Sequence, residues 1–559
     1  MRTLIRTLKI KGMQLSGAPA GEKPKFSLPD FILEKSRAIE KLFLVLVILS
    51  VIAAPFVEVN YDLTEYLPDT VQSKQGLDLM EGKFGYPGTA RVMIEDVTLY
   101  QAKLYKDKLE AVDGVDQILW LDMGTDVYSS SSFIDSSDIA DYYKDGSAVM
   151  DVTFVEGDTS KKTSEAIDAM MEILGDKGYF TGPAVQNKSL EENVSREMNM
   201  ILALGVLMIF LILCITTNSW FEPVLYLTIM GVAILINKGT NIFLGRISFL
   251  TDSVSAVLQL AVSMDYSIFL IHAYTREKQK GIEQRQALRN AIDEALRSIF
   301  ASSLTTIVGF IVLAFMKFSI GFDMGIVLAK GIVVSLVTVV LFMPAMILRT
   351  MSLIERTAHR PFLPDFEGLS RKIYKIRWAV LIFVAVIIIP AYTAQGMNSF
   401  LFGNESVGDS EGTKVYEDEQ VINEKFGRSN LMIALVPNTS MVTEKAFSDE
   451  VESLPYTKSV TSMAGTLPAG IPERFLPRSV TELLHKEDYA RILIYVKSKG
   501  ESPLAYQCSD EIQAIMKRYY PEHSYLVGTT PSTLFMSVHF ENTSTKAGSV
   551  VMSVFHSPE

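Results

Sequence analysis

Residues 252–274 read DSVSAVLQLAVSMDYSIFLIHAY, a run long and apolar enough to cross a bilayer as one helix. Asp265 stands inside this run, with Asp252 at one edge and His272 near the other end. A carboxylate near the middle of a membrane costs several kcal/mol, so it is rarely kept without a use. Asp265 therefore indicates a proton relay, an ion-coupling site or a buried polar contact that fixes the packing of a static bundle.

The rest of the chain is rich in similar apolar runs. It has 559 residues, of which 48% are hydrophobic, and its mean hydropathy is +0.23. Seven segments reach the length of a membrane helix, although Lys238 interrupts the third. The predicted helices are residues 42–59, 198–216, 224–244, 250–274, 298–316, 322–348 and 378–394. The composition thus predicts a polytopic α-helical membrane protein.

Positive charge predicts how these helices are oriented. Residues 1–41 contain nine Lys and Arg, residues 275–297 contain six, and residues 349–377 contain seven. Such segments stay in the cytoplasm. The N-terminal segment 1–41 and the linker 349–377 are therefore expected inside. The two long polar stretches, residues 60–197 and 395–546, are expected outside the cytoplasmic membrane.

An internal repeat organises the two polar stretches. Lys83-Phe84-Gly85 recurs as Lys425-Phe426-Gly427, and residues 179–183 (YFTGP) match residues 525–529 (YLVGT). Between these markers each copy shows a strand, a helix, a strand, a second helix and a final strand. This order predicts two extracytoplasmic α+β domains of ferredoxin-like type.

The repeat unit consists of one helix, one α+β domain and then five more helices, residues 198–348 in the first copy. The second copy has its helix and its domain, and then residues 547–559 are too short to span a membrane. We therefore expect a truncated or aberrant tail, and a chain that does not transport by itself.

In this arrangement the chain resembles the RND superfamily of transporters, and within it the MMPL family. The residues that match are Asp265-Tyr266 in the fourth helix, Gly182-Pro183, and the stretch 341–348 (LFMPAMIL). The resemblance implies porter-type domains in an RND-like tandem repeat. It also implies export of lipids or other hydrophobic compounds driven by the proton-motive force, with Asp265 and Tyr266 as proton relay. In the family a second Asp-Tyr pair lies on the tenth helix, which is absent here.

The residues support an ion-driven mechanism independently. Residues 76–84 (GLDLMEGKF) have the wrong spacing for a nucleotide-binding P-loop. A desolvated aspartate is a group whose pKa a membrane can shift toward neutral. Tyr266 points about 100° away from Asp265 on a helix, either toward a partner on the next helix or as an ordinary interface aromatic.

Other polar residues in the predicted helices are candidates for support. Lys330, in the sixth helix, either pairs with Asp265 or extends to the outer surface. Ser302, Ser303, Thr305 and Thr306 on the fifth helix offer a hydrogen-bonding face or simple packing contacts. No cofactor, metal site, hydrolytic motif or nucleic-acid partner is expected. The expected partners are a hydrophobic or lipid substrate, protons and membrane lipids, with homo-oligomers left open.

Three functions therefore remain open from the sequence. The first is a proton-driven exporter in a bacterial cell membrane. The second is a non-transporting sensor or accessory membrane protein with the same fold. The third is an inactive truncated fragment of the first. The buried acid favours the exporter over the sensor, because a sensor has less need of such a group.

Overall fold

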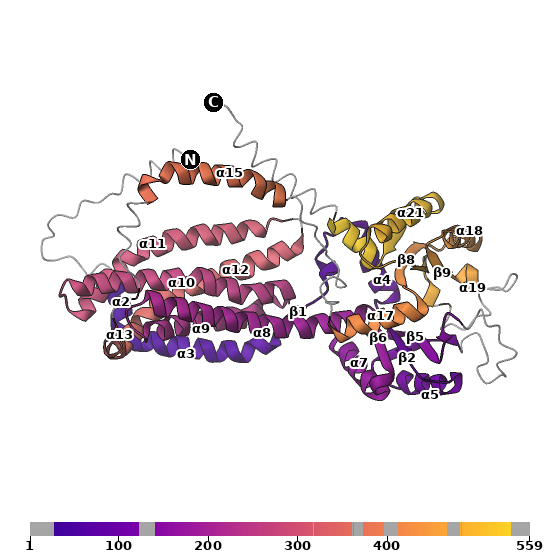
Figure 1. Cartoon of the computed structure of the whole chain (residues 1–559), viewed down its shortest axis with the longest axis horizontal. Coiled ribbons are helices and arrows are strands. Elements are labelled where there is room, and N and C mark those ends of the chain that lie inside the picture. The colour runs from indigo at the N-terminus through magenta and orange to yellow at the C-terminus, as the bar shows by residue number, and fades with distance from the viewer. Residues whose placement is uncertain are drawn as a thin grey trace, which may run out of the picture.

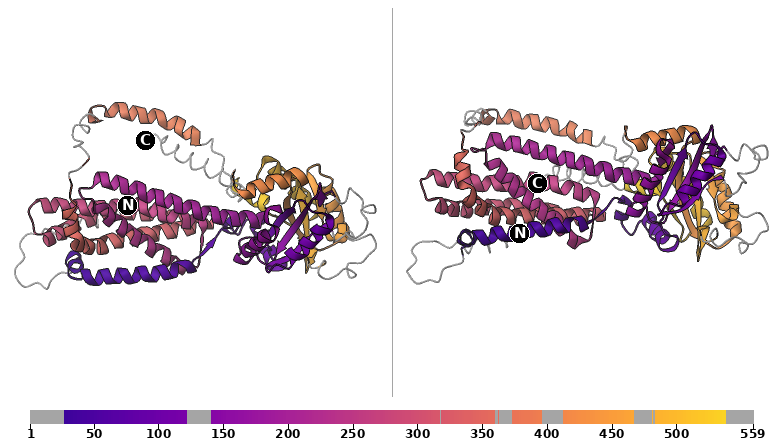
Figure 2. Two further views of the ribbon diagram at one scale, coloured as in Figure 1. Left: turned by 60° about the horizontal axis from the view of Figure 1, so that its bottom comes forward. Right: turned by 90° about the horizontal axis from the view of Figure 1, so that it is seen from below.

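The structure is a computed structural model that describes residues 27–121, 140–316, 318–359, 362, 373–395, 412–466, 481 and 483–537. The predictions for residues 1–26 and for the tail 547–559 lie outside this part of the chain. Within it, a helical bundle adjoins a pair of α+β domains (Figure 1). The two parts are joined chiefly by one long helix, α8 (Figures 1 and 2).

Seven membrane spans are found among the described residues, which confirms the seven predicted helices. They are α3 (Ser36–Ala53) with η1 (Ala54–Phe56), α8 (Pro183–Thr216), α9 (Glu222–Gly239) with η6 (Thr240–Leu244), α10 (Phe249–Gln279), α11 (Gln284–Leu313), α12 (Ser319–Val337) with η7 (Thr338–Phe342) and α13 (Met343–Arg356), and α15 (Arg377–Gln395). A short helix α2 (Leu28–Glu34) precedes α3.

The first six spans pack around one apolar core. Tyr226, Ile229, Tyr266, Ile332 and Met343 are among its fully or almost fully buried side chains. The seventh span, α15, differs, since all its described side chains are exposed. It stands apart from the other helices in Figure 1 and in the left view of Figure 2.

The sixth span runs further than predicted. The sequence placed its end at residue 348, but the helix continues to Arg356. A π-helical turn, η7, comes just before Pro344. Proline removes a hydrogen-bond donor and its ring crowds the preceding turn. The wider turn gives the ring room without ending the helix, so Pro344 does not terminate this span.

Helix α8 also begins earlier than the apolar run that predicted it. It starts at Pro183, directly after Gly182, whose φ is 106°. Residues other than glycine rarely adopt that backbone conformation, and a Cβ at Gly182 would lie 3.0 Å from the Cα of Ala90. Pro183 then fits the first helical turn, where no donor is needed. The Gly-Pro pair therefore turns the last strand of the first domain straight into a 34-residue helix.

The first domain holds one five-stranded sheet. Its strands are β2 (Thr89–Ile94), β3 (Val115–Leu119), β4 (Tyr143–Lys144), β5 (Ser147–Phe154) and β6 (Gly178–Thr181). Their order is β3-β5-β2-β6, with β4 also paired to β5, and all pairs are antiparallel. Helices α5 (Leu99–Glu110) and α7 (Lys161–Leu174) supply Leu109, Ile167 and Met170 to the core on one face.

The second domain repeats this plan strand for strand. Its strands are β8 (Asn430–Pro437), β9 (Thr457–Thr461), β10 (His485–Lys486), β11 (Tyr489–Val496) and β12 (Tyr525–Val527), in the order β10-β11-β8-β12 with β9 also paired to β11. Helices α18 (Met441–Glu452) and α21 (Pro503–Tyr519) pack on one face, and α19 (Met463–Thr466) follows β9. The repeated glycines share a conformation too, since φ is 75° at Gly85 and 73° at Gly427.

The two domains exchange a helix. Helix α4 (Gln72–Phe84) precedes the first sheet in the chain but packs on strand β12 of the second. Leu77 and Met80 of α4 share a cluster with Ile433, Leu435 and Val527. The close approach requires Gly76, where a Cβ would meet Val527 at 2.4 Å.

The reciprocal helix is α17 (Lys414–Phe426), which precedes the second sheet but packs on strand β6 of the first. Ile422 and Phe426 cluster with Met93 and Val149. Asp418 of the same helix accepts a hydrogen bond from the backbone N–H of Phe180 at 3.1 Å. Each sheet is thus covered on its second face by a helix from the other half, so the two domains share their cores.

Candidate functional site in the membrane bundle

Asp265 lies on an exposed face of α10. Val254, Ala261, Phe269 and His272 share this face, because they follow one another at helical spacing and are all exposed. Among the described residues, no hydrogen bond or ion pair of the Asp265 carboxylate is found. The structure therefore places the acid at membrane depth on the outside of the six-helix bundle rather than in its core.

Tyr266 points the other way, as the helical rotation predicts. Its ring is only 2% exposed, and it belongs to the main core of the bundle. The hydroxyl approaches that of Thr306 on α11 but does not reach hydrogen-bond geometry. The two neighbouring residues thus lie in different surroundings, Asp265 on the surface of the bundle and Tyr266 at the α10–α11 interface.

The hydroxyl groups on the predicted polar face of α11 form hydrogen bonds within their own helix. The hydroxyls of Ser303, Thr305 and Thr306 each donate to a carbonyl three or four residues earlier in their own helix. Ser302 and Thr305 are exposed, whereas Ser303 is buried. Of these residues, Thr306 is the one that approaches the proposed relay, through Tyr266.

Lys330 lies elsewhere than at Asp265. Its Nζ donates to the backbone oxygen of Asn237 at 3.1 Å, to Oγ1 of Thr240 at 3.0 Å and to Oδ1 of Asn241 at 2.5 Å. These oxygens mark the C-terminal end of α9, where the helix dipole favours a cation. Three neutral acceptors therefore hold the ammonium group, and neither the predicted ion pair with Asp265 nor extension to the outer surface is seen.

A buried amide network next to Lys330 escaped the sequence analysis. Asn237 Nδ2 donates to Gln259 Oε1 at 3.0 Å, and Gln259 Nε2 donates to the backbone oxygen of Gly331 at 3.1 Å and to Ser335 Oγ at 2.9 Å. The side chains of Asn237, Gln259 and Ser335 are at most 3% exposed. The amide residues Asn237 and Gln259 inside apolar runs could have predicted this network, because buried polar groups in membranes need hydrogen-bond partners.

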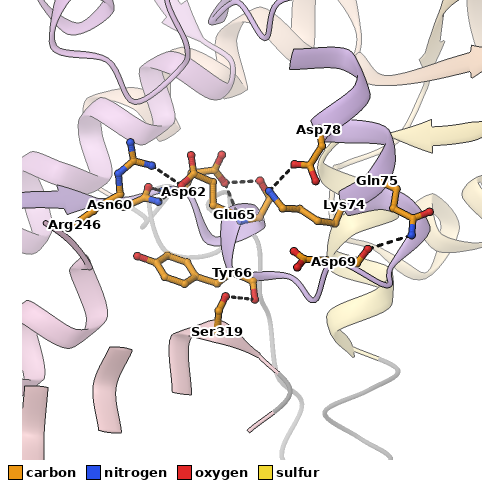
Figure 3. A network of polar contacts seen from close by, with 11 residues as sticks. Asn60, Asp62, Glu65, Tyr66, Asp69, Lys74, Gln75, Asp78, Arg246 and Ser319 are labelled. Carbon is orange, nitrogen blue, oxygen red and sulfur yellow. Dashed lines mark hydrogen bonds and ion pairs between the residues drawn. The ribbon is translucent and has the colours of Figure 1, made fainter. Parts of the chain in front are cut away.

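A second polar network joins the bundle to the first domain (Figure 3). Strand β1 (Glu58–Asn60), which follows the first span, pairs in parallel with β7 (Arg246–Ser248), which precedes α10. Arg246 contacts Glu58 at 3.2 Å and Glu65 at 2.7 Å. Glu65 also accepts a hydrogen bond from Asn60 at 2.6 Å.

The sixth span joins the same junction from the other side. Ser319 Oγ donates to the backbone oxygen of Tyr66 in η2 (Leu63–Tyr66) at 3.1 Å. The backbone N–H of Ser248 donates to Asp323 at 2.6 Å. The start of α10, the start of α12 and the strand that leads into the first domain are therefore held together directly.

Two acids lie close together beyond this junction. Asp158 accepts the backbone N–H of Thr89 at 2.8 Å, and Asp62 accepts both the backbone N–H and the hydroxyl of Thr64. Burial, and after it the charge of Asp62, raise the pKa of Asp158 to about 7, although the bond from Thr89 opposes the shift. Burial raises the pKa of Asp62 as well. Asp158 is therefore a group that titrates near neutral pH.

Comparison with known proteins identifies the family of this chain. The MMPL family profile matches residues 67–360, more than half of the chain. A membrane protein of Methanocaldococcus jannaschii is 27% identical over 38% of this chain and 55% of its own length. The membrane protein YdgH of Bacillus subtilis is 22% identical over 52% of this chain and 31% of its own.

A relative with a more specific name is the siderophore exporter MmpL5 of Mycobacterium tuberculosis. It is 25% identical over 34% of this chain and 20% of its own length. The chain thus covers less than two thirds of each of these relatives. The matched region contains α4 to α13, and with it Asp265, Tyr266 and Lys330. The chain belongs to the MMPL family, and it is a multi-pass bacterial membrane protein.

Proposed function

We propose that the protein exports lipids or other hydrophobic compounds in exchange for protons, and that Asp265 is the group that takes up and releases the proton. The observation that supports this most is the position of Asp265, inside a membrane span, on an exposed face and beside the buried Tyr266. A carboxylate that faces acyl chains is costly, so this face is expected to meet a polar partner surface during transport. A second helical bundle of the same type would supply one.

We also propose that both α+β domains are ferredoxin-like and lie outside the cytoplasm. The support is the strand order they share and the positive charge of residues 275–297, which lie at the opposite end of the bundle. The substrate class rests on the family and on the printed name of one relative, a siderophore exporter. The exchanged helices would make the two domains move as one body during transport.

The coupling is tested by replacing the acid with its amide. Inverted membrane vesicles from cells that make the protein, with any natural partner bundle present, are loaded with a pH dye, and a pH gradient is imposed. Asp265→Asn removes the titrating group at nearly constant volume and should abolish proton flux. Asp293→Asn is the matched control, because it makes the same change at an exposed position in the first half of the next helix, α11. Equal flux in the two variants would reject Asp265 as the coupling residue.

The orientation has a separate test. Glu110, at the exposed end of α5, and Gln279, at the last turn of α10, lie at opposite ends of the molecule and are both exposed. Each is replaced by cysteine and labelled in intact cells with a reagent that does not cross membranes. The native Cys214 and Cys508 are buried and give a low background. Glu110→Cys should react and Gln279→Cys should not, and the reverse pattern would contradict the proposed topology.

A further inference from the structure

The second domain contains a buried arginine on the face of its sheet that α4 covers. Arg491 of β11 is 8% exposed, and it pairs across the sheet with Leu435 of β8. Leu435 and Leu493 point to the same face, because residues two apart on a strand share a side, and both belong to the apolar cluster around α4. The guanidinium lies over the ring of Phe84, 5.2 Å from the ring centre. A charged group is therefore enclosed by apolar side chains at the end of α4.

The described part of the chain gives Arg491 no counter-charge. No hydrogen bond or ion pair of its guanidinium is found there, and its buried Nε has no acceptor. Burial lowers the pKa of Arg491, and Tyr495 opposes this shift. Burial also raises the pKa of Tyr495, so that its phenol is uncharged at neutral pH. A buried cation without a partner is costly, so this position indicates an anion that the chain itself does not supply.

The internal repeat shows that the fold does not require an arginine here. Arg491 pairs with Leu435, and the equivalent pair in the first sheet is Val149 with Met93. Val149 packs with Phe426 at the end of α17, in the same way that Arg491 lies at the end of α4. One position therefore holds an aliphatic side chain in the first domain and a guanidinium in the second, although both domains fold to the same plan.

The acids of the first sheet are missing from the second. Arg91 of β2 lies 3.5 Å from Asp151 on the neighbouring strand, so the arginine of the first sheet has its own carboxylate. Glu95, at the end of β2, forms an ion pair with α17. The equivalent positions in the second sheet are Leu493 and Pro437. The second domain has thus gained a buried cation where the first has none, and has lost both acids.

The chemistry of the site favours an oxyanion. The planar guanidinium donates two parallel hydrogen bonds to the oxygens of a carboxylate or a phosphate, and it binds these groups better than a point charge does. Only 8% of Arg491 is exposed, and Phe84 covers the guanidinium. A small anion therefore suits the site better than the head of a lipid, which would bring its chains with it.

We propose that Arg491 binds a small oxyanion, a phosphate or a carboxylate, between the end of α4 and the sheet of the second domain. Helix α4 belongs to the first half of the chain, so the bound anion fastens the exchanged helix to the second half. It does so by neutralising the charge that otherwise lies unpaired beneath Phe84. The binding involves no proton transfer and lies outside the membrane helices, so it stands or fails independently of the role of Asp265.

Hydrogen exchange of the full chain tests the binding. The protein is kept in dodecyl maltoside micelles, which carry no phosphate, and phosphate, acetate or chloride is added at equal ionic strength. Phosphate at ten times its dissociation constant should slow the openings of β8 and β11 about tenfold, because only the closed state binds it. Acetate should act at higher concentration, since it carries less charge, and chloride should have little effect. Strand β5 of the first sheet should change much less.

Two variants of Arg491 assign the effect to its side chain. Arg491→Val installs the residue that the first sheet has at the equivalent position, so the variant should fold and lose the response to phosphate. Arg518→Gln is the control, because it removes an arginine that is exposed on α21 of the same domain. Arg491→Lys keeps the charge without the planar guanidinium and should show a weaker response, which gives a result even if the valine variant does not fold.

Decyl phosphate separates a free anion from one that is carried by an amphiphile, and it should be no more effective than phosphate. Equal responses to phosphate and chloride, or a response to decyl phosphate alone, would overturn the proposal. So would a phosphate response in Arg491→Val that matches the response of the unchanged protein.

Discussion

Truncation of Met80 to alanine tests the exchange of helices between the two domains. Met80 belongs to α4, which precedes the first sheet, but its side chain is 3% exposed and packs with Ile433, Leu435 and Val527 of the second sheet. Large-to-alanine changes at buried positions cost about 2–5 kcal/mol. If α4 belongs to the second core, this loss must appear mainly in the second domain.

Hydrogen exchange measures the loss strand by strand. In Met80→Ala, the amides of β8 and β12 should exchange faster by roughly 30-fold or more, since about 1.4 kcal/mol corresponds to a factor of ten. Strand β5 of the first sheet should change much less. Glu81→Ala is the control, because its side chain is exposed on the same helix. Faster exchange confined to the first sheet, or none in either, would refute the exchanged packing.

Three further predictions concern single residues. Because the pKa of Asp158 is raised to about 7, the folded state holds more protons than the unfolded state between about pH 4 and 7. The free energy of unfolding should fall as pH rises through that range. Asp158→Asn should make the melting temperature depend less on pH, as thermal unfolding recorded at several pH values would show. Lys330→Met should leave the pH midpoint of carbodiimide labelling at Asp265 unchanged, and a shifted midpoint would revive their pairing. Gly182→Ala should destabilise the start of α8 by about 1–2 kcal/mol, measured by hydrogen exchange in β6, because alanine resists a positive φ.

The sequence was informative wherever a single segment decides its own structure. Seven apolar runs predicted the seven spans, because a bilayer demands about 20 apolar residues whatever else the chain does. The ends were harder to place. The first turns of α8 lie outside the apolar run, so hydropathy could not find Pro183 as its start. The sixth span continues to Arg356 rather than ending at residue 348, because its last turns carry polar and charged residues that hydropathy does not count as helix.

Contacts between segments were the part that the sequence could not predict. The Lys-Phe-Gly repeat marked matching positions at the start of the two domains, but it did not predict that a helix ends there or which sheet that helix covers. The partner of Lys330 was missed for a related reason. Counting residues gives depth along a helix axis, whereas the direction around the axis depends on how α9, α10 and α12 pack. That packing turns Lys330 toward Thr240 and Asn241.

Helix α8 acts as a lever arm, because it has no break between the sheet of the first domain and the far end of the membrane. Its 34 residues span about 51 Å at 1.5 Å per residue. A change of tilt of about 5° at one end of such a rod moves the other end by about 4 Å. The Gly-Pro turn ties that moving end directly to β6, the strand on which α17 lies. A small reorientation of the helices in the bilayer would therefore be magnified, and both sheets would be displaced together.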